Sequence, residues 1–296
     1  MQICIIFNPA ARGNKARHFR RHLDEIAAQC ALKATSAPGD ARRLAAQAVA
    51  DGFDLIVAAG GDGTVHETLN GLGDVPGGFA RARLGVLPLG TINVFARELQ
   101  IPLEIPQAWE VLQRGGEMKM DLPWAEFSVA GVRKKQYFAQ LAGSGLDARA
   151  IEMVSWSLKK RFGPLAYLLA GLQALGEAKP TITARAGDRS VAGELVLIGN
   201  GRRYGGTFDI FPRAELTNGR LEVCGVPRMD WPTLLRCAPG LLLRGRLPEG
   251  VIQRFSAERL SLSSPTPAAF ELDGEWVGQL PVELGVDPQA LRVAVP

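Results

Sequence analysis

Strand-like and helix-like segments alternate from residue 1 to about residue 115, and this alternation limits the fold more than any other feature of the chain. Short apolar runs typical of buried strands alternate with longer amphipathic runs typical of helices. We expect strands at 2–7, 31–36, 54–59 and 84–88, with helices at 15–29, 39–51, 64–71, 92–98 and 105–114. This order predicts a parallel sheet with helices on both faces, and such sheets bind ligands at the carboxyl ends of their strands.

After Met118 the pattern changes to short alternating runs separated by glycine and proline, which is typical of an antiparallel sandwich. We expect strands at 135–142, 181–186, 191–198, 207–211, 220–225, 257–263, 268–272, 280–286 and 291–295, and helices at 148–158, 165–175 and near 231–244. A chain of 296 residues that is 47% apolar can form two cores. The sequence therefore predicts an α/β fold, with a parallel-sheet domain at 1–122 and a β-rich sandwich domain at 123–296.

The expected strand at 54–59 runs into the sequence GGDGT at 60–64. Glycines can adopt positive φ and bring backbone N–H groups against phosphate oxygens, and a helix that begins at Thr64 adds the positive end of its dipole. Thr64 and Glu67 have the spacing of a capping box. Asp62 is unfavourable beside phosphates unless it holds Mg²⁺ or accepts a proton. The loop therefore predicts a catalytic nucleoside triphosphate site; a plain strand-to-helix turn is the alternative.

Two further loops, at 8–15 and 88–93, also follow expected strands, so all three should meet at one rim of the sheet. Near the end of the chain, the sequence LDGE at 272–275 places two carboxylates in a tight hairpin. One of them could deprotonate a hydroxyl group during phosphoryl transfer. The GxGxxA match at 143–148 lacks the βαβ context of a dinucleotide site, and the Walker and protein-kinase sequences are absent.

Charge and composition narrow the partners and the compartment. The net charge is +4, and basic clusters such as 133–135 and 159–161 could face anionic phospholipid or polyphosphate. Nucleic acid is not expected as a partner, because no nucleic-acid-reading motif accompanies these clusters. The four cysteines have no metal-ligand spacing, and no apolar run is long enough to span a bilayer. We expect a cytoplasmic protein that contacts the inner face of a membrane without crossing it.

Taken in order, the motifs resemble the soluble diacylglycerol kinases and their bacterial lipid-kinase relatives, which include sphingosine and ceramide kinases. The matching segments are NPA with its glycine at 8–13, Thr35 before 39–41, GGDGT with Glu67 and Asn70, PLGTxN at 88–93, Asp121, GSGLDA at 143–148, 200–206, 212–219 and LDGE at 272–275. This resemblance implies an N-terminal domain similar to those of NAD kinase and 6-phosphofructokinase. It also implies a C-terminal β-rich domain, with the active site between the two.

The resemblance also implies roles for individual residues. The nucleotide would contact Asn8, Gly13, Lys15, Thr35, Gly60, Gly61, Asp62, Gly63, Thr64, Val65, His66 and Thr91. Asp62 would serve the Mg-nucleotide, and Asp273 or Glu275 would be the catalytic base. The implied cofactors are ATP and Mg²⁺, and the implied substrate is diacylglycerol or a similar lipid at the bilayer surface. Apolar surface at 149–175 and 231–247 would receive the lipid tail.

Two positions depart from the family pattern. Val94 stands where an acid commonly follows PLGTxN, and Asn218 stands where an aspartate usually helps to hold a structural Mg²⁺. Asn218 offers an oxygen without charge, so we expect weak or no metal there. Two alternatives stay open: a kinase of a soluble substrate such as NAD, because GGDGT occurs there too, and a non-catalytic regulator that binds nucleotide or lipid. The acceptor lipid and the oligomeric state, including a homodimer, also stay open.

Overall fold

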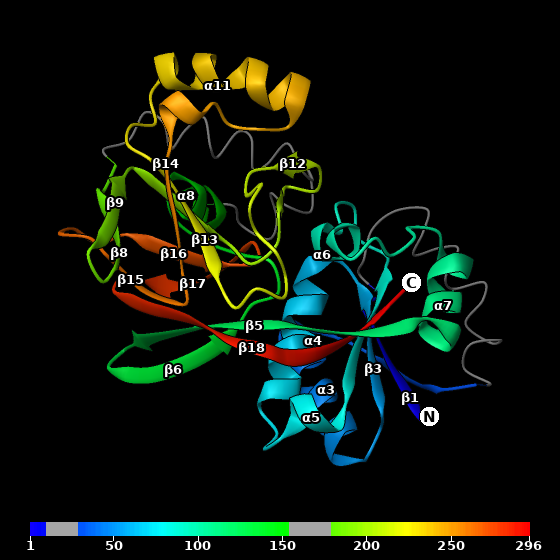
Figure 1. The fold of residues 1–296 in the computed structure, drawn as a ribbon. Helices are drawn as coiled ribbons and strands as arrows, with labels where there is room; N and C mark the ends of the chain where they lie inside the picture. Colours follow the sequence, from blue (N-terminus) through cyan, green and yellow to red (C-terminus); the bar gives the residue numbers. More distant parts are fainter. Residues whose placement is uncertain (10–28, 154–178) are drawn as a thin grey trace.

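The computed structural model describes residues 1–9, 29–153 and 179–296, which form an N-terminal and a C-terminal lobe (Figure 1). Four parallel strands build the N-terminal lobe, in the order β2-β1-β3-β4. They are β1 (Ile3–Phe7), β2 (Ala31–Ala34), β3 (Leu55–Gly60) and β4 (Arg83–Pro88). Its helices are α3 (Asp40–Ala50), α4 (Asp62–Gly73), α5 (Gly78–Arg81), α6 (Val94–Glu98) and α7 (Ile105–Arg114). The predicted parallel sheet is confirmed; most of the helix expected at 15–29 lies outside the described residues.

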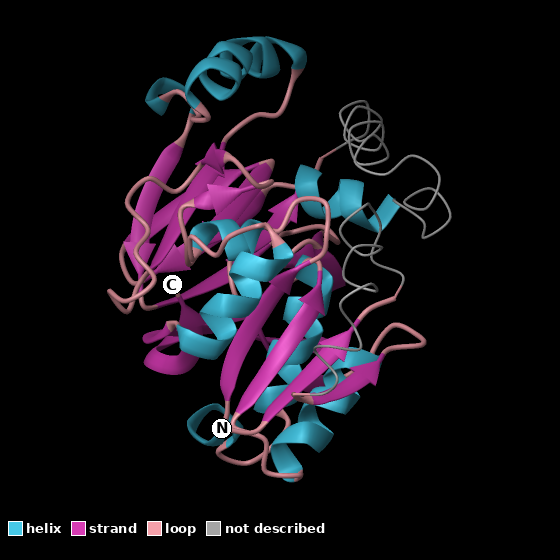
Figure 2. Ribbon diagram, turned by 90° about the vertical axis from the view of Figure 1, so that its right-hand side faces the viewer, coloured by secondary structure: helices cyan, strands magenta, loops and turns pink. Residues whose placement is uncertain are grey.

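Helices cover this sheet, and the strands point in one direction (Figure 2). Every residue of β3 is buried, as expected for a central strand that is covered on both faces. Helix α4 packs on β3 and helix α7 packs on β4. The carboxyl ends of β1, β3 and β4 therefore lie at one rim. This is the rim at which we expected the loops at 8–15, 60–64 and 88–93 to meet.

Two long antiparallel strands run from one lobe into the other: β5 (Gly116–Val129) and β18 (Val282–Val295) (Figure 1). The end of β18 also pairs in parallel with β4, through Val293 and Leu84. The parallel sheet and part of the C-terminal lobe thus belong to one ten-stranded sheet. The buried side chains of Leu291, Val293 and Ala294 complete the N-terminal core.

The structure differs from the sequence prediction in both of these strands. Residues 280–286 and 291–295 form one strand with a bulge between Asp287 and Leu291, and not two strands. Asp121 holds this bulge, because its Oδ1 accepts a hydrogen bond from the backbone N–H of Gln289. Strand β5 was not expected, because its central residues are buried without alternation and Pro123 interrupts the strand signal.

The C-terminal lobe contains a second, six-stranded antiparallel sheet in the order β14-β13-β10-β7-β16-β17. Side chains of this sheet share one core with β5, β8, β15 and β18, so the predicted sandwich is confirmed. The strands not yet named are β6 (Val132–Tyr137), β7 (Leu141–Gly145), β8 (Ile182–Ala186), β9 (Arg189–Gly193), β10 (Leu195–Gly199), β11 (Arg203–Tyr204), β12 (Phe208–Asp209), β13 (Leu221–Val226), β14 (Gln253–Ala257), β15 (Arg259–Ser263), β16 (Ala269–Leu272) and β17 (Glu275–Gln279). The helices are α8 (Leu146–Met153), α11 (Trp231–Arg244) and a short 3₁₀ helix (Glu249–Val251). Among the described residues, no helix has the length and hydropathy needed to cross a membrane.

Candidate active site

The glycine loop (residues 60–64) joins β3 to α4, and the lack of a side chain at Gly60, and at Gly90 in the neighbouring loop, is required for space. A Cβ added to Gly60 would lie 2.2 Å from Oγ1 of Thr64, and one added to Gly90 would lie 2.5 Å from Cα of Gly61. The loop does not use the positive φ that glycine allows: Gly61 has a φ of −94°, and none of the three glycines in the loop is among the described glycines with positive φ. The absence of side chains lets two loops meet backbone to backbone.

Helix α4 begins at Asp62 with Gly61 as its N-cap, two residues before the predicted start at Thr64. The predicted capping box is therefore wrong. Glu67 instead accepts hydrogen bonds from the backbone N–H groups of Gly39 and Ala41, so it caps the neighbouring helix α3. The earlier start places Asp62 in the first turn, at the positive end of the helix dipole.

The other predicted nucleotide-binding loops meet the glycine loop at the same rim. Nδ2 of Asn8 donates a hydrogen bond to Oγ1 of Thr64 at 3.3 Å. The backbone N–H of Thr35 donates to the carbonyl of Phe7, which places Thr35 beside the end of β1. Gly13 and Lys15 lie outside the described residues.

Residues 88–93 form a closed loop beside the glycine loop. Oδ1 of Asn93 accepts a hydrogen bond from the N–H of Gly90, and Nδ2 of Asn93 donates to the carbonyl of Gly90. Thr91 is exposed at the tip. In contrast, the side chain of Val65 is part of the hydrophobic core, so only its backbone is available to a nucleotide.

The carboxyl group of Asp62 is largely buried between the two loops. Its Oδ1 accepts a hydrogen bond from the N–H of Phe95 at 3.2 Å. Burial raises the pKa of Asp62 above its usual range, backbone hydrogen bonds oppose the shift, and repulsion from Asp273 adds to it. No lysine, arginine or histidine among the described residues forms an ion pair with Asp62. Its ionised form would therefore be stabilised by a bound cation.

Asp273 is held by hydrogen bonds from the protein itself. Its two oxygens accept from the backbone N–H groups of Ala139, Gln140 and Leu141 at 2.8–3.1 Å. The ring nitrogen Nδ1 of His66 lies 3.1 Å from Oδ2 of Asp273. His66 is buried, and its ring faces this carboxylate of the C-terminal lobe.

Glu275 is the first residue of β17, and its side chain is exposed. A Cβ added to Gly63 would lie 2.9 Å from Oε1 of Glu275, so this carboxylate lies directly over the glycine loop. The structure thus brings together Asp62, Asp273 and Glu275, the three residues for which the sequence predicts catalytic roles.

Sequence reasoning gave no role to two carboxyl groups behind the hairpin, the fully buried Glu271 and the partly buried Asp147. Oε2 of Glu271 accepts a hydrogen bond from the N–H of Gly274 at 2.7 Å, and Asp147 accepts from the hydroxyl of Tyr204 at 2.6 Å. Burial raises the pKa of Glu271 well above its ordinary value, and the nearby charge of Asp147 adds to this effect. The sequence feature that could have identified Glu271 is its position two residues before Asp273, inside an otherwise apolar strand.

The predicted weak metal position at Asn218 lies in an exposed turn. Oδ1 of Asn218 accepts a hydrogen bond from the N–H of Arg220, which uses the oxygen that a metal would need. Nearby, Oδ2 of Asp121 accepts from the N–H of Gly219 at 2.6 Å. Within the described parts of the chain, no three histidine, cysteine or acidic side chains form a metal-binding group.

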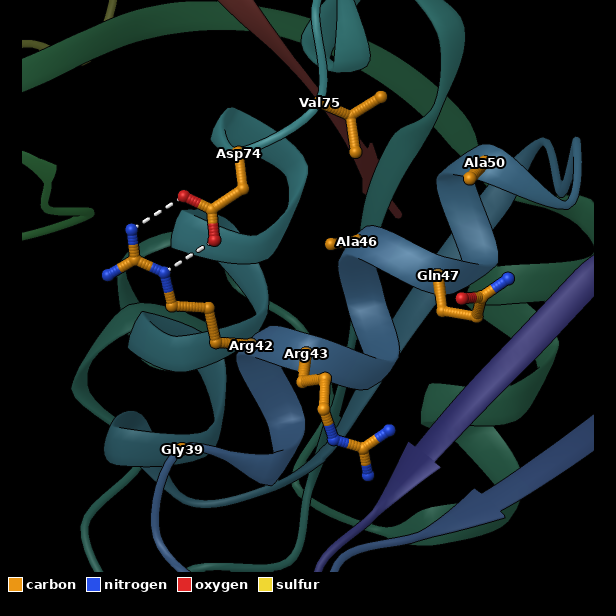
Figure 3. Close-up of a pocket in the computed structure, with 8 residues that line it drawn as sticks. All are labelled: Gly39, Arg42, Arg43, Ala46, Gln47, Ala50, Asp74 and Val75. Carbon is orange, nitrogen blue, oxygen red and sulfur yellow. Dashed lines mark hydrogen bonds and ion pairs between the residues drawn. The ribbon is translucent and has the colours of Figure 1, made fainter.

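A surface depression beside α3 is separate from this site (Figure 3). Arg42 on its wall forms a two-bond ion pair with Asp74. The lining residues are Gly39, Arg42, Arg43, Ala46, Gln47, Ala50, Asp74 and Val75. None of them belongs to the glycine loop or to the hairpin at 272–275.

Comparison with known proteins agrees with this geometry. The family model for the diacylglycerol kinase catalytic domain matches residues 2–124, and the model for the YegS C-terminal NAD kinase beta sandwich-like domain matches residues 140–295. A diacylglycerol kinase of Bacillus subtilis is 31% identical over 290 residues, which cover 94% of this chain and 91% of that protein. A Pseudomonas aeruginosa protein named as a probable YegS-like lipid kinase is 33% identical over 275 residues, which cover 92% of this chain and 86% of that protein.

The crystal structure of a diacylglycerol kinase from Bacillus anthracis superposes with a TM-score of 0.76 at 22% identity, over 100% of this chain and 97% of that one. This similarity supports the same two-part fold. Together with the two family models and the curated relatives, it shows that this chain belongs to the diacylglycerol kinase family of lipid kinases and is a phosphotransferase.

Proposed function

We propose that this protein transfers the γ-phosphoryl group of ATP to a hydroxyl group of diacylglycerol or a related membrane lipid. The observation that carries the proposal is the position of Glu275, whose Oε1 would lie 2.9 Å from a Cβ at Gly63. A carboxylate of the C-terminal lobe thus lies over the glycine loop of the N-terminal lobe, and loops of this kind bind phosphates. Phosphoryl transfer needs an oriented acceptor, a base and neutralised phosphate charge, and this junction offers groups for each.

Residues of the N-terminal lobe would hold the nucleotide. Backbone N–H groups of the glycine loop at 60–64 and the N-terminus of α4 would face its phosphates. Asn8, Thr35 and Thr91 lie at the same rim, and we propose Gly13 and Lys15, which follow Asn8 in the sequence, as further contacts of the nucleotide. Kinases of this family use ATP, which fits a site made of phosphate-binding loops.

Asp62 fits the role of a Mg²⁺ ligand. Its oxygens are the hard donors that Mg²⁺ prefers, and its ionised form has no cationic partner among the described residues. When bound, Mg²⁺ would neutralise charge on the phosphates. Asp62 would hold the cation beside the phosphates of the nucleotide.

Glu275 is the better candidate for the base, and Asp273 is better placed to hold the hairpin. Both oxygens of Asp273 already accept hydrogen bonds from backbone N–H groups and from His66. Glu275 is exposed beside Gly63 and can reach a substrate hydroxyl. In the reaction, Glu275 takes the hydroxyl proton, the lipid oxygen forms a bond to the γ-phosphorus, and the bond to the bridging oxygen breaks to release ADP.

The lipid substrate would bring the protein to the inner surface of the membrane. The relatives carry two kinds of name, diacylglycerol kinase and lipid kinase, so the acceptor is proposed as a class.

The test is a phosphorylation assay with labelled ATP, Mg²⁺ and vesicles that contain diacylglycerol, sphingosine, ceramide or monoacylglycerol, with NAD as a soluble acceptor. We expect labelled lipid from at least one vesicle type and no labelled NAD, and loss of both activity and Mg-dependent ATP binding in Asp62→Ala. Labelled NAD without labelled lipid would indicate the soluble-substrate kinase. ATP binding without transfer to any acceptor, at any Mg²⁺ concentration, would indicate a regulator.

A further inference from the structure

Helix α11 carries an apolar stripe on its outer side that no described part of the chain covers. Trp231, Leu235, Leu242 and Leu243 are 60%, 71%, 82% and 83% exposed, and Pro239 is exposed as well. The positions 231, 235, 239 and 242 lie four, four and three residues apart, so they share one face of the helix. We call these five residues the outer stripe. In Figure 1 the helix forms one end of the molecule.

The opposite face of α11 anchors the helix to the C-terminal lobe. Cys237 is buried, and Leu234 and Leu241 pack against a hydrophobic cluster of that lobe. The side chain of Asp230 caps the first turn, and Gly245 ends the helix in the left-handed conformation. The helix is therefore fixed without any contribution from the outer stripe, and an exposed apolar face of this size indicates a binding surface.

The charges around the stripe are positive. Arg236 and Arg244 are exposed on the helix, and no acidic residue occurs between Asp230 and Glu249. Within the described ranges, neither arginine forms a hydrogen bond or ion pair. An apolar face with a tryptophan at one end and arginines at its margin matches the interface of an anionic bilayer, where rings lie at headgroup level and cations contact phosphates.

The C-terminal end of α11 is connected by contacts to the nucleotide rim. The carbonyl of Gly245 accepts a hydrogen bond from the N–H of Asp209 at 2.6 Å, and Arg246 pairs with the carboxylate of Asp209. Asp209 ends the small hairpin of β11 and β12. At the tip of that hairpin, a Cβ added to Gly206 would lie 2.8 Å from Cγ2 of Ile92, next to Thr91. A partner bound to α11 would thus have a defined orientation relative to the candidate active site.

We propose that the outer stripe of α11 docks onto an anionic phospholipid bilayer, with the leucines inserted among the acyl chains and with Trp231, Arg236 and Arg244 at the level of the headgroups. The choice of a bilayer as partner rests on the proposed lipid substrate. A second copy of this chain is the competing occupant, and the experiment separates the two.

The experiment measures sedimentation of the purified full-length chain with vesicles of phosphatidylcholine alone or mixed with phosphatidylglycerol. The double variant L235E/L242E should bind mixed vesicles about tenfold or more weakly. The two glutamates replace exposed leucines and would place charges in the acyl region of the bilayer. The control Q107E adds a charge at an exposed position of α7, in the N-terminal lobe, and should bind like the parent. Equal binding by L235E/L242E and the parent would overturn the proposal.

Two further measurements identify the partner. Brominated lipid should quench the fluorescence of the parent, and Trp231→Phe should remove most of that quenching. R236Q/R244Q should reduce binding to mixed vesicles and leave binding to phosphatidylcholine unchanged; parent-like binding to mixed vesicles would contradict the role of the arginines. A dimer in sedimentation velocity that L235E/L242E dissociates, without vesicle binding by the parent, would assign the stripe to a second copy and overturn the proposal.

Activity separates this inference from the proposed function. The face of α11 that is turned toward the C-terminal lobe carries Leu234 and Leu241, so a lipid tail inside the protein would contact that face and not the outer stripe. With a short-chain diacylglycerol dispersed as single molecules, the parent and L235E/L242E should therefore turn over equally, and only vesicle-borne substrate should distinguish them. If the parent phosphorylates no lipid but its vesicle binding depends on α11, the proposed function fails and the docking surface stands. If both proteins phosphorylate vesicle lipid equally, the docking surface fails and the proposed function stands.

Discussion

Nδ1 of His66 lies 3.1 Å from Oδ2 of Asp273, although 207 residues separate them along the chain. Because Asp273 accepts hydrogen bonds with both oxygens, this geometry assigns a ring hydrogen to Nδ1 of His66. The contact joins α4, which begins with Asp62, to the hairpin that carries Glu275. A buried pair therefore sets the distance between two candidate catalytic carboxylates.

Glu275→Gln should retain the fold and lose catalysis. The side chain is exposed, so the variant should unfold at the temperature of the parent, while loss of the base should lower kcat by about a hundredfold to ten-thousandfold. Steady-state kinetics and thermal unfolding test this prediction. An unchanged kcat would exclude Glu275 as the base.

Asp273→Asn should lose stability as well as activity. An amide cannot accept all the hydrogen bonds that the carboxylate receives from Ala139, Gln140, Leu141 and His66, so we expect a loss of about 2–4 kcal/mol in unfolding free energy. Chemical denaturation measures the change. A variant as stable as the parent, but inactive, would instead return Asp273 to the role of base.

Asp62→Asn should stabilise the protein while abolishing transfer. Burial disfavours the ionised carboxyl and Asp273 repels it, so a neutral amide should raise the unfolding free energy at neutral pH by about 1 kcal/mol. Added Mg-ATP should stabilise the parent and have little effect on the variant. Equal stabilisation of both by Mg-ATP would contradict the role of Asp62.

Gly63→Ala and Gly90→Ala form a matched pair. A Cβ at Gly63 meets the end of a flexible Glu275 side chain, so the variant should lower kcat by about tenfold and, because alanine favours helices, gain up to about 1 kcal/mol in stability. A Cβ at Gly90 would lie 2.5 Å from the backbone of Gly61, so that variant should lose about 1–3 kcal/mol. Thermal unfolding of both proteins, with kinetics for Gly63→Ala, tests the contrast. A destabilised Gly63→Ala would show that the space above Gly63 is tighter than the carboxylate contact indicates.

Glu271→Gln should change the pH dependence of stability. The folded-state pKa of Glu271 lies well above the ordinary value of 4.5, so the folded state keeps a proton that the unfolded state releases. The parent should therefore lose stability as pH rises above that value toward the folded-state pKa. The variant, which cannot ionise, should show a smaller loss when denaturation is measured from pH 4 to pH 8. Parallel curves would show that Glu271 is ionised in the folded protein.

Local patterns predicted the parallel sheet of the N-terminal lobe and placed the candidate site at the end of β3, because β3 and its glycine loop are consecutive in the sequence. Long-range contacts could not be predicted in the same way. Glu67 has capping-box spacing within its own helix α4, yet it caps α3. The sequence could not show this contact, because α3 and α4 become neighbours only when the chain folds. The separate roles proposed for Asp273 and Glu275 rest on the backbone N–H groups of Ala139 and its neighbours, which are more than 130 residues from Asp273 along the chain.

The pairing of β5 with β18 also limits how the protein can move. Domain closure in enzymes usually turns on a few flexible residues in a connecting segment. Here two hydrogen-bonded strands pass side by side between the halves of the molecule, so a wide swing would break their ladder (Figure 1). We expect substrate entry and product release to depend on movements of individual loops, while the two halves keep a nearly constant orientation.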